Sequence, residues 1–457
     1  MITSKEISIA KKCISHAISN GASAARVYLN KCVTDSCTIL NSELDKVTHS
    51  ADRSIYIYLF VDGRYGTFST NRFDDKELED FVCKAISMVR MLGKDLCRKL
   101  PDIGRTAKDA VTGRELGLFD ASCLNMDAQT RLDNAHRMSI YKTIAAVDES
   151  RGYRLISEEC EYSCTAEDNY TIDSQGFEGR HSETAFGTFS EMTIEDKDGN
   201  KYSGYWWNTS RKASDTDLEE CSKKALERAV SQIGPEKRRS GTYRMVVDNT
   251  VSSRLVSPLL TALNAASIQQ KMSFLEDSLG RKIFHEGLTL SDLPRTYGKN
   301  GSRLFDTEGV ATKDAVVIEN GVVKQYFVNT YMSEKMGIPP TIEDISRPCM
   351  NAYMKGKDLQ SEEKEVSLKD ILLACSNGIL VTGFNGGNCN PVTGDFSFGI
   401  EGYAFRNGKI SHPVREMLIT GNIVALWNKL VAVGSDARNC SRWQIPSLAF
   451  EDVVFSA

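Results

Sequence analysis

The sequence has no long apolar run. No stretch approaches the ~20 consecutive apolar residues that a membrane helix needs. The first residues, MITSKEISIAKKCISHAISNGAS, are interrupted by Lys5, Glu6, Lys11 and Lys12. These charges exclude the apolar segment of a secretory signal. We therefore expect a cytoplasmic protein that does not enter a membrane.

The sequence also lacks an excess of positive charge. Its 56 Lys and Arg are outnumbered by 61 Asp and Glu, so the formal net charge is −5, and the pI is about 5.9. The basic residues are scattered along the chain. Nucleic-acid binding relies on a basic face that neutralises phosphates. Nucleic acid is therefore not an expected partner.

Cysteine is present, but no Cys framework is. The thirteen Cys, an odd number, are spread from Cys13 to Cys440, and no C-x-x-C pair occurs among them. A zinc finger is therefore not expected. In the cytosol these residues should be reduced and mostly buried thiols.

Motifs of well-known catalytic sites are incomplete or absent. IFHEGLTL carries His285-Glu286, but a helical zinc site needs a second His about one turn later, where Thr289 and Leu290 stand. The segment GDFSFG around Ser397 has one residue too many for a serine nucleophile elbow. A P-loop and a G-x-G-x-x-G are absent. The six His stand at positions 16, 49, 136, 181, 285 and 412, and we expect each of them at the surface or with a hydrogen-bond partner.

The order of predicted elements indicates several domains, as 457 residues are too many for one core. A helix over roughly 4–20 begins with the capping box of Thr3 and Glu6. Alternating strands follow, and then an amphipathic helix that Asp74 caps. A helix over about 131–148, strands, a turn and a helix from Asp217 then follow up to 233. We interpret this repeated order as a degenerate duplication. Hairpins with Asn-Gly turns at Asn320 and Asn407 dominate the remainder of the chain, and the segment IVALWNKLVAV is predicted to form one more helix before the last strand.

GPEKRRSGT, at 234–242, has the Gly, Pro and charge content of an exposed linker. The sequence therefore predicts an α+β protein with a duplicated helix-strand-helix N-terminal region followed by a β-rich C-terminal domain. The predicted divisions are an N-terminal α/β subdomain over 1–100, a central subdomain over 101–234 that repeats the first, and the β-rich domain over 235–457.

One segment has an unusual composition for a β region. GFNGGNCNPVTGDFSFGIEGYAF, at 383–405, holds six Gly, three Asn and one Pro among strand-forming residues. Such a composition indicates a backbone that bends sharply or that another chain approaches closely. A plain wide loop between two strands would explain it equally well. Loops on rigid sheets often carry function.

Three long motifs resemble a known family. They are GSRLFDTEGVATKDAVVIENGVVKQYFVNTYMSEKMG, NPVTGDFSFGIEGYAFRNGKISHPV and ITGNIVALWNKLVAVGSD, and they occur in this order. Together they resemble the C-terminal half of the TldD/PmbA family, historically called modulators of DNA gyrase. The N-terminal half is similar to that family in its helix lengths and strand pattern.

The resemblance implies a zinc metallopeptidase that cleaves unfolded peptides and consists of a TldD-like chain and a PmbA-like (TldE) chain. The TldD-like chain carries an H-E-x-x-x-H helix, and by the family's order this helix falls at about Val256–Gln269. That segment, VSPLLTALNAASIQ, contains no His, Cys, Asp or Glu. Cys440 lies near the place of the family's Cys ligand, but one thiolate alone cannot hold catalytic zinc. The chain thus resembles the PmbA type, with zinc expected on a TldD-like partner and no cofactor on this chain.

Our leading hypothesis is a non-catalytic subunit that lines the peptide channel of such a peptidase and pairs with a TldD-like chain. We expect no catalytic residue and no metal ligand in this chain. The candidate channel residues are Asn390, Pro391, Thr393, Gly394, Asp395, Ser397 and Gly399, of which Asn390 and Asp395 would offer polar contacts and Gly394 and Gly399 room for a peptide backbone.

Two alternatives stay open. In the first, the chain is a peptidase by itself, as a homodimer whose zinc is held by scattered His, Cys440 and carboxylates. In the second, it is a regulatory protein that binds DNA gyrase through protein contacts, as the family's old name suggests. A homodimer of the chain alone is compatible with each hypothesis.

Overall fold

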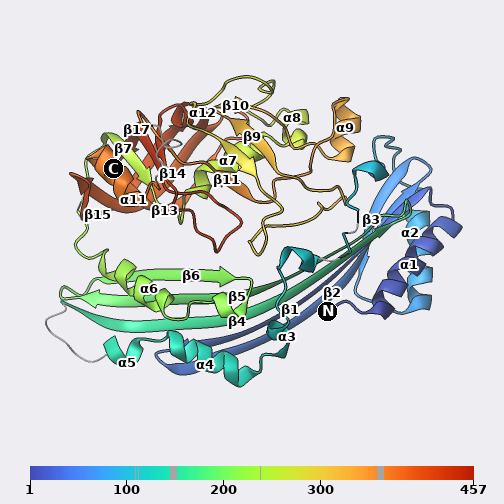
Figure 1. Ribbon diagram of the computed structural model, residues 1–457, viewed down its shortest axis with the longest axis horizontal. Helices are drawn as coiled ribbons and strands as arrows, with labels where there is room; N and C mark the ends of the chain where they lie inside the picture. Colours follow the sequence, from blue (N-terminus) through green and yellow to red (C-terminus); the bar gives the residue numbers. More distant parts are fainter. Residues whose placement is uncertain (109, 112, 145–151, 237, 358–364) are drawn as a thin grey trace. The chain divides into compact units, whose positions relative to one another are not determined.

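The computed structural model describes residues 1–108, 110–111, 113–144, 152–236, 238–357 and 365–457. The chain divides into two compact units (Figure 1). Unit 1 consists of 1–230, 295–312 and 330–338, and unit 2 consists of 231–294, 313–329 and 339–457. Among the described residues, no helix is long and apolar enough to cross a membrane.

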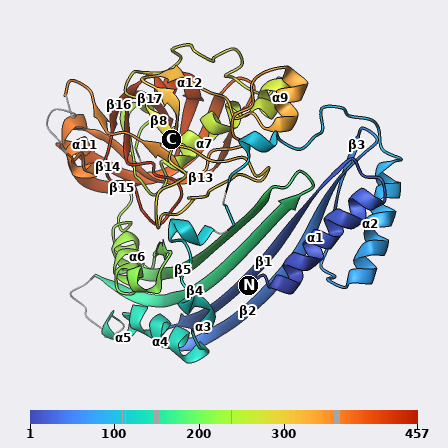
Figure 2. The ribbon, with the colours of Figure 1, turned by 45° about the vertical axis from the view of Figure 1, so that its right-hand side comes forward.

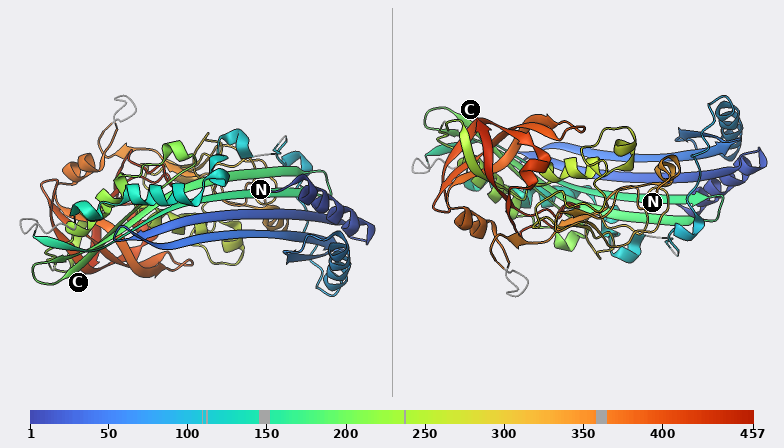
Figure 3. Two further views of the ribbon diagram at one scale, coloured as in Figure 1. Left: turned by 90° about the horizontal axis from the view of Figure 1, so that it is seen from below. Right: turned by 90° about the horizontal axis from the view of Figure 1, so that it is seen from above.

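Unit 1 is built on one antiparallel six-stranded sheet. Its strand order is β3-β2-β1-β4-β5-β6, so the strands of the two predicted N-terminal subdomains join through the β1–β4 pair (Figure 3). The strands are β1 Ala24–Leu40, β2 Glu43–Val61, β3 Arg64–Thr70, β4 Tyr153–Asp173, β5 Glu178–Asp196 and β6 Lys201–Ser210. The predicted duplication is compatible with this order, since each region contributes three consecutive strands followed by a helix.

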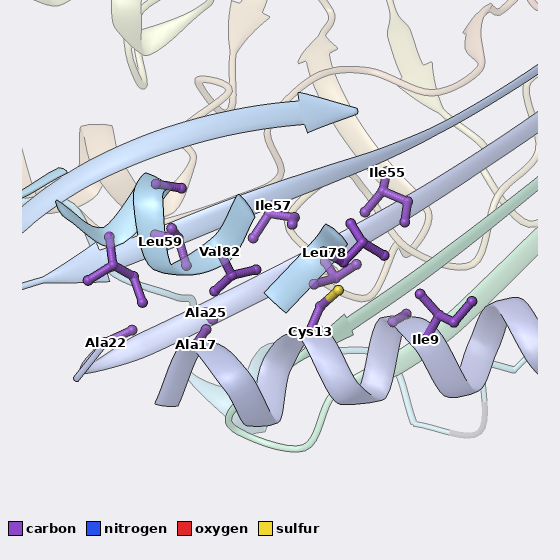
Figure 4. Packing of buried hydrophobic residues seen from close by; sticks show 14 of the residues in the cluster. Ile9, Cys13, Ala17, Ala22, Ala25, Ile55, Ile57, Leu59, Leu78 and Val82 are labelled. Atoms are coloured by element: carbon purple, nitrogen blue, oxygen red, sulfur yellow. The ribbon is translucent and has the colours of Figure 1, made fainter. Parts of the chain in front are cut away.

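Helices α1 (Ser4–Ser19) and α2 (Asp75–Val89) cover one face of β1 and β2 (Figure 2). Both predicted starts are confirmed: Thr3 and Glu6 form the capping box, and Asp74 accepts hydrogen bonds from two N–H groups of α2. The apolar stripes of both helices pack on the odd-numbered β2 residues that point to this face (Figure 4). Burial of these stripes, at roughly 25 cal/mol per Å² of apolar surface, holds the helices on the sheet.

A second set of helices covers the same face over β4 and β5. The prediction of one helix over 131–148 is wrong in its extent. Asp127 caps α4, which ends at Met138, because the buried carboxylate of Glu158 accepts hydrogen bonds from Ser139 and from the N–H groups that follow it. Residues 145–151 lie outside the described residues. The helices of unit 1 that follow α2 are α3 Ser122–Asn125, α4 Ala128–Met138, α5 Tyr141–Ile144, α6 Glu220–Val230 and α9 Thr330–Met336, with 3-10 turns at Ile103–Arg105, Gly113–Leu116 and Ala213–Asp215.

Unit 2 is built on a closed barrel of five strands. The order β17-β15-β14-β13-β7 closes because β17 also pairs with β7. All pairs are antiparallel except β13–β7. The barrel strands are β7 Gly241–Val247, β13 Gly378–Cys389, β14 Asp395–Arg406, β15 Lys409–Asn422 and β17 Leu448–Ser456, and β16 Leu430–Val433 and β12 Tyr353–Met354 extend the sheet beyond β17. The N-terminal half-open sheet and this barrel make the protein α+β, as predicted.

The rest of unit 2 is a small four-stranded sheet and short helices. The sheet has the order β10-β9-β8-β11, and its strands are β8 Leu290–Asp292, β9 Ala315–Glu319, β10 Val322–Val323 and β11 Pro348–Met350. The helices are α7 Ser253–Ala262, α8 Ala265–Gln269, α11 Leu368–Cys375 and α12 Ile423–Trp427. The predicted Asn-Gly turns are confirmed, since Asn320, Gly321, Asn407 and Gly408 all have positive φ.

The predicted helix over IVALWNKLVAV is half wrong. Only Ile423–Trp427 is helical, and Leu430–Val433 forms β16. β16 pairs with β17, so tertiary pairing of β-branched residues outweighs the helical pattern there.

None of the thirteen Cys forms a disulfide, and each is buried or half-buried. Burial raises the pKa of Cys13 to about 11 and that of Cys160 to about 12. Thiols with such pKa values stay protonated at neutral pH and react slowly. The prediction of mostly buried thiols is confirmed.

Candidate functional site

The predicted channel residues lie on one hairpin of unit 2. Asn390 to Gly394 form the turn between β13 and β14, and Ser397 and Gly399 lie on β14 itself. The turn is closed by its own hydrogen bonds: the Asn390 side chain accepts from the Val392 N–H (2.9 Å), and the Gly394 N–H donates to the Asn390 carbonyl (2.8 Å). This is an Asx turn. The segment is therefore a tight hairpin tip and not a wide loop.

The Asp395 carboxylate anchors the hairpin tip to the next strand. It accepts hydrogen bonds from the Thr393 hydroxyl (2.7 Å) and from the Asn422 amide (3.0 Å), and the same amide donates to the Thr393 carbonyl (2.8 Å). The hydrogen bonds from Asn422 and Thr393 lower the pKa of Asp395. Asp395 is thus an ionised side chain with one partner in the tip and one on β15, and its chemistry does not suit a general acid.

The two glycines of the predicted channel are packed against this chain's own atoms. Gly394 has a positive φ of 79°, and a Cβ there would lie 3.3 Å from the Phe274 ring. A Cβ on Gly399 would lie 2.3 Å from the Asn385 carbonyl oxygen, at the bulge where β13 and β14 change register. Both positions require glycine for the hairpin itself.

A cavity of about 380 Å³ lies between α7 and this hairpin. Its lining comes from the outward face of α7, from Phe274 and from one side of the hairpin: Arg254, Ser257, Pro258, Thr261, Ala262, Phe274, Gly387, Asn388, Cys389, Pro391 and Phe398. Of the predicted channel residues, Pro391 lines the cavity. Ligand sites of proteins commonly have ~300–1,000 Å³, so the cavity has room for one or two residues of a peptide.

Arg254 is the charged residue of the lining. Its Nη2 donates to the Gly387 carbonyl (3.0 Å), and its guanidinium lies 5.0 Å from the centre of the Phe398 ring. Phe398 in turn stacks on Phe396, with ring centres 5.2 Å apart. The aromatic face and the carbonyl hold the guanidinium in place, and its other N–H groups can bind a carbonyl or carboxylate of a ligand.

Sequence reasoning missed this cavity, although α7 carries a signal for it. Leu255, Val256 and Leu259 form the buried side of the helix, while Arg254, Ser257, Pro258 and Thr261 recur at helical spacing on the other side. Periodicity could therefore have placed Arg254 on the outward face. It could not have shown that the hairpin from far along the chain packs above it.

The cavity does not fit a zinc ion. The segment 256–269, where the resemblance places the zinc helix, forms α7 and α8 and presents Ser257, Pro258 and Thr261 to the cavity. Cys389 is the one thiol of the lining, and burial together with the charge of Asp395 raises its pKa, which disfavours the thiolate that binds metal. Across the described parts of the chain, no group of three or more His, Cys, Asp or Glu could hold a metal ion.

His285 and Glu286 lie apart from α7, in a turn before β8. The His285 Nδ1 accepts from the Gly287 N–H (3.0 Å), and the ring packs edge-on against Tyr353, with ring centres 5.5 Å apart. Glu286 is exposed and lies 3.6 Å from the Lys282 ammonium. The expectation that His285 lies at the surface or has a hydrogen-bond partner is confirmed.

Three of the other candidate His ligands contact carboxylates of this chain, and the candidate thiol of Cys440 lies far from α7 in the sequence. His49 contacts Asp35 (2.8 Å), His181 contacts Glu183 (3.2 Å) and His16 lies 3.7 Å from Glu79. Cys440 is buried in a turn between β16 and β17.

Comparison with known proteins places the chain among relatives of similar length. Models of three successive domains match it in order: PmbA/TldA metallopeptidase domain 1 over residues 25–89, the central domain over 124–233 and the C-terminal domain over 240–457. A crystal structure of a Bacteroides thetaiotaomicron VPI-5482 protein described as a modulator of DNA gyrase is 38% identical and superposes with a TM-score of 0.92, and the match covers 100% of both chains.

Two more distant relatives are named PmbA and TldE. The protein named Metalloprotease PmbA of Escherichia coli O157:H7 is 25% identical over 437 residues, which cover 95% of this chain and 92% of the relative. The crystal structure of TldE from Thermococcus kodakarensis is 17% identical with a TM-score of 0.77, covers 98% of this chain and 100% of that chain, and shares its fold.

Proposed function

Because this chain belongs to the PmbA/TldD metallopeptidase family, we propose that it is the PmbA/TldE-like subunit of a zinc metallopeptidase acting on unfolded peptides. In this proposal a TldD-like chain binds the zinc and carries out the cleavage. This chain holds the peptide. The observation that carries the proposal is the cavity beside α7, which has the size and lining of a peptide site and side chains that do not fit a metal.

The lining of the cavity suits an extended peptide. Pro258, Phe274, Pro391 and Phe398 offer apolar surface, which accepts an apolar side chain without regard to the rest of the sequence. Arg254 offers fixed N–H donors beside this surface. A peptide carbonyl or terminal carboxylate can accept from them, so the cavity recognises features that all unfolded chains share.

The neighbouring edge of β13 supports the same use. β7 pairs with β13 only from Ile379 to Val381, and the exposed residues that follow, Asn385 to Asn388, pair with β14 on their other side. An extended peptide can add to such an edge as a further strand, with backbone hydrogen bonds that are independent of sequence. Arg254 contacts the Gly387 carbonyl on this edge, so added strand and cavity would form one continuous site.

We retain the predicted channel residues in this proposal with a division of roles. Pro391 contacts the peptide directly. Asn390, Thr393, Gly394 and Asp395 hold the hairpin tip in shape through their mutual hydrogen bonds. Ser397 and Gly399 would form the outer wall of the channel, toward the TldD-like partner.

Mixing experiments test the proposal. Purified chain and a TldD-like chain should form a complex whose peptidase activity on an unfolded peptide exceeds that of either chain alone. Arg254→Ala should lower kcat/KM of the complex about tenfold, because a charge-assisted hydrogen bond contributes on the order of 1.5–3 kcal/mol. Arg406→Ala, an exposed Arg on the same hairpin, is the matched control and should leave activity unchanged. Absence of a complex, or of any gain in activity, would contradict the proposal.

Metal analysis separates this function from that of a self-sufficient peptidase. Stoichiometric zinc in the chain purified alone, removed by a chelator together with peptidase activity, would support a homodimeric metallopeptidase. We expect less than stoichiometric zinc and no activity in that preparation.

The description of the Bacteroides relative as a modulator of DNA gyrase keeps a regulatory role as a second candidate function. Recovery of gyrase at stoichiometric levels in a pull-down with this chain would favour it.

A further inference from the structure

Three thiols of unit 1 gather on the helix-covered face of the sheet. Cys37 lies on β1, Cys164 on β4 and Cys123 on α3, and these residues are only 1%, 1% and 4% exposed. β1 and β4 pair Cys37 with Tyr162, two residues before Cys164, so Cys37 and Cys164 are diagonal neighbours on one face. The Cys123 thiol contacts the Cys164 thiol directly, from the helix above.

A buried cation lies among these thiols. The side chain of Arg131 on α4 is 10% exposed, and its guanidinium contacts both Cys37 and Cys164. Its Nη1 donates to the Met126 carbonyl (2.5 Å), and its Nη2 lies 3.5 Å from the Asp35 carboxylate. Within the described residues, its Nε has no hydrogen-bond partner. A buried N–H without an acceptor is costly, and a thiolate sulfur beside the guanidinium supplies a negatively charged acceptor.

The surroundings of Cys164 differ from those of the other buried thiols. The hydrogen bond from Cys123 and the charge of Arg131 lower the pKa of the Cys164 thiol, although burial and the Asp35 carboxylate oppose them. Cys160, on the same strand, contacts the Ser222 hydroxyl (3.3 Å) in place of a cation, and burial raises its pKa to about 12. A thiol held near a cation and beside a second thiol is the one that oxidants attack first.

We propose that Cys164 and Cys123 form a redox modification site, at which a hydroperoxide such as hydrogen peroxide oxidises Cys164 and Cys123 then closes a disulfide. The Cys164 thiolate attacks one oxygen of the peroxide, the O–O bond breaks, and the departing hydroxide takes up the proton that Cys164 had released, which gives water. Cys164 now carries a sulfenic acid. The Cys123 sulfur attacks the Cys164 sulfur, the S–S bond forms as the S–O bond breaks, and the Cys123 proton leaves with the hydroxide as a second water. The two sulfurs lose two electrons, which the peroxide gains.

Cys37 is less suited than Cys123 to close the disulfide. Diagonal neighbours on two paired strands have Cα atoms roughly 7–8 Å apart, which exceeds the ~4.4–6.8 Å of most disulfides. The ladder between β1 and β4 is continuous here, so neither strand can approach the other. Burial also raises the pKa of the Cys37 thiol. Cys123 is therefore the resolving thiol.

The helix that carries Cys123 is short. α3 is a single turn, and Ala121 before it provides no side-chain cap. Short segments of this kind open locally while the rest of the domain stays folded. Such an opening admits a molecule as small as hydrogen peroxide to Cys164. The disulfide then joins α3 to β4 and closes the chain over 123–164, which restricts the unfolded state of unit 1.

Peptide mapping tests the disulfide. The reduced full chain is treated with hydrogen peroxide, its remaining thiols are alkylated, and it is digested with trypsin and Glu-C, which separates Cys160 from Cys164 because Glu161 lies between them. Mass spectrometry should show a disulfide between 123 and 164 as the first product. In Cys123→Ser, dimedone should trap the sulfenic acid of Cys164. In Cys221→Ser, the matched control, the 123–164 disulfide should form at the rate of the parent chain.

The oxidation rate tests the role of the cation. Arg131→Gln should lower the rate constant with hydrogen peroxide roughly tenfold, because the thiolate is the reactive form and one pKa unit changes its fraction tenfold. Arg131→Lys keeps a positive charge and should lose less of the rate. Arg137→Gln, at an exposed position on the same helix, is the matched control and should leave the rate unchanged. Circular dichroism checks that each variant is folded.

The site lies in unit 1 and does not depend on the proposed peptidase role. Three results would overturn it: a disulfide between Cys160 and Cys221 that forms as fast as the 123–164 disulfide, a 123–164 disulfide that forms only in urea, or equal oxidation rates in Arg131→Gln and the parent chain. The first would mean that buried thiols react without regard to the cation. The second would mean that the folded chain protects both thiols.

Discussion

The six-stranded sheet of unit 1 and the five-stranded barrel of unit 2 differ in how they treat the unpaired edges of their strands. Both are mostly antiparallel and both must protect strand edges. The barrel has no edge where β17 pairs with β7 and closes the circle, and an edge remains only on the part of β13 that extends beyond β7. The sheet keeps an open edge on β2 and covers it with charged residues. An open edge can recruit another chain, whereas a closed barrel can act only through the loops and hairpins that extend from it.

The two units also differ in what they bury. The covered face of the sheet buries polar groups, among them Glu158, Asp168, Ser182, Thr188 and Ser190. The largest fully buried side chains of unit 2 are Trp427, Phe284, Phe327, Phe398, Phe405, Phe450 and Phe455. Unit 1 should therefore respond to pH and charge, and unit 2 to the loss of aromatic volume. The three variants that follow test this contrast.

Trp427→Ala should have the largest effect and should act on unit 2. The indole is fully buried, packs edge-on against Phe450 with ring centres 5.3 Å apart, and donates to the Leu255 carbonyl (3.2 Å). Removal of a buried Trp leaves a cavity and costs about 3–5 kcal/mol of unfolding free energy. Urea denaturation at pH 7 and pH 5 should give the same loss. A loss below about 1 kcal/mol, or one that varies with pH, would contradict the apolar character assigned to this unit.

Asp168→Asn should have an intermediate effect and should act on unit 1. The fully buried carboxylate accepts from Arg180 Nε (2.9 Å), from the Ser182 hydroxyl (2.8 Å) and from the Ile2 N–H (2.9 Å). An amide keeps the volume but loses the charge and one acceptor, which costs about 1.5–3 kcal/mol. Hydrogen exchange measured by mass spectrometry should show faster exchange in β4 and β5 and no change in the barrel strands. The exposed Asp80→Asn on α2 is the matched control, and equal effects of both variants would contradict the prediction.

The sequence predicts interactions between residues that are close together in the chain better than interactions between residues that are far apart. The start of α1 at Thr3 and the turn at Asn320-Gly321 follow from chemistry within a few residues, and both were predictable. The β1–β4 pair and the closure of the barrel by β17 and β7 join residues far apart in the chain. Residue pattern gives no register for such pairs. For the same reason the strand β16 was predicted as helix.

The candidate site shows the same limit. Sequence composition located the hairpin tip, because Asn, Pro and Gly are required by its turn. The polar side chains Asn390 and Asp395 were predicted to offer contacts to a peptide, and in the structure they hydrogen-bond to the Val392 N–H, the Thr393 hydroxyl and the Asn422 amide of β15. The cavity depends on Arg254 of α7 meeting Phe398 of β14. A contact between two segments so distant in sequence follows from the fold alone.

Glu183→Gln should have the smallest effect of the three, and only in a window of pH. Burial acts to raise the pKa of the Glu183 carboxyl, but the hydrogen bond from His181 and the charge of Arg211 outweigh it, so that its pKa in the folded protein is lowered. A lowered folded pKa adds stability above the unfolded value of about 4.3, and this stability is lost as the pH falls through that value toward the folded pKa.

The variant should therefore have a lower free energy of unfolding than the parent at pH 7. The difference between the two free energies should become smaller once the pH drops below about 5. Urea denaturation of both proteins between pH 7 and pH 3 measures this gap. Glu219→Gln, at a carboxylate 74% exposed beside Lys223, should show no such narrowing, because an exposed pair contributes little. A free-energy difference that stays constant with pH would mean that Glu183 acts through packing alone. Asp168→Asn would then be the one variant here that tests whether the sheet depends on charge more than the barrel does.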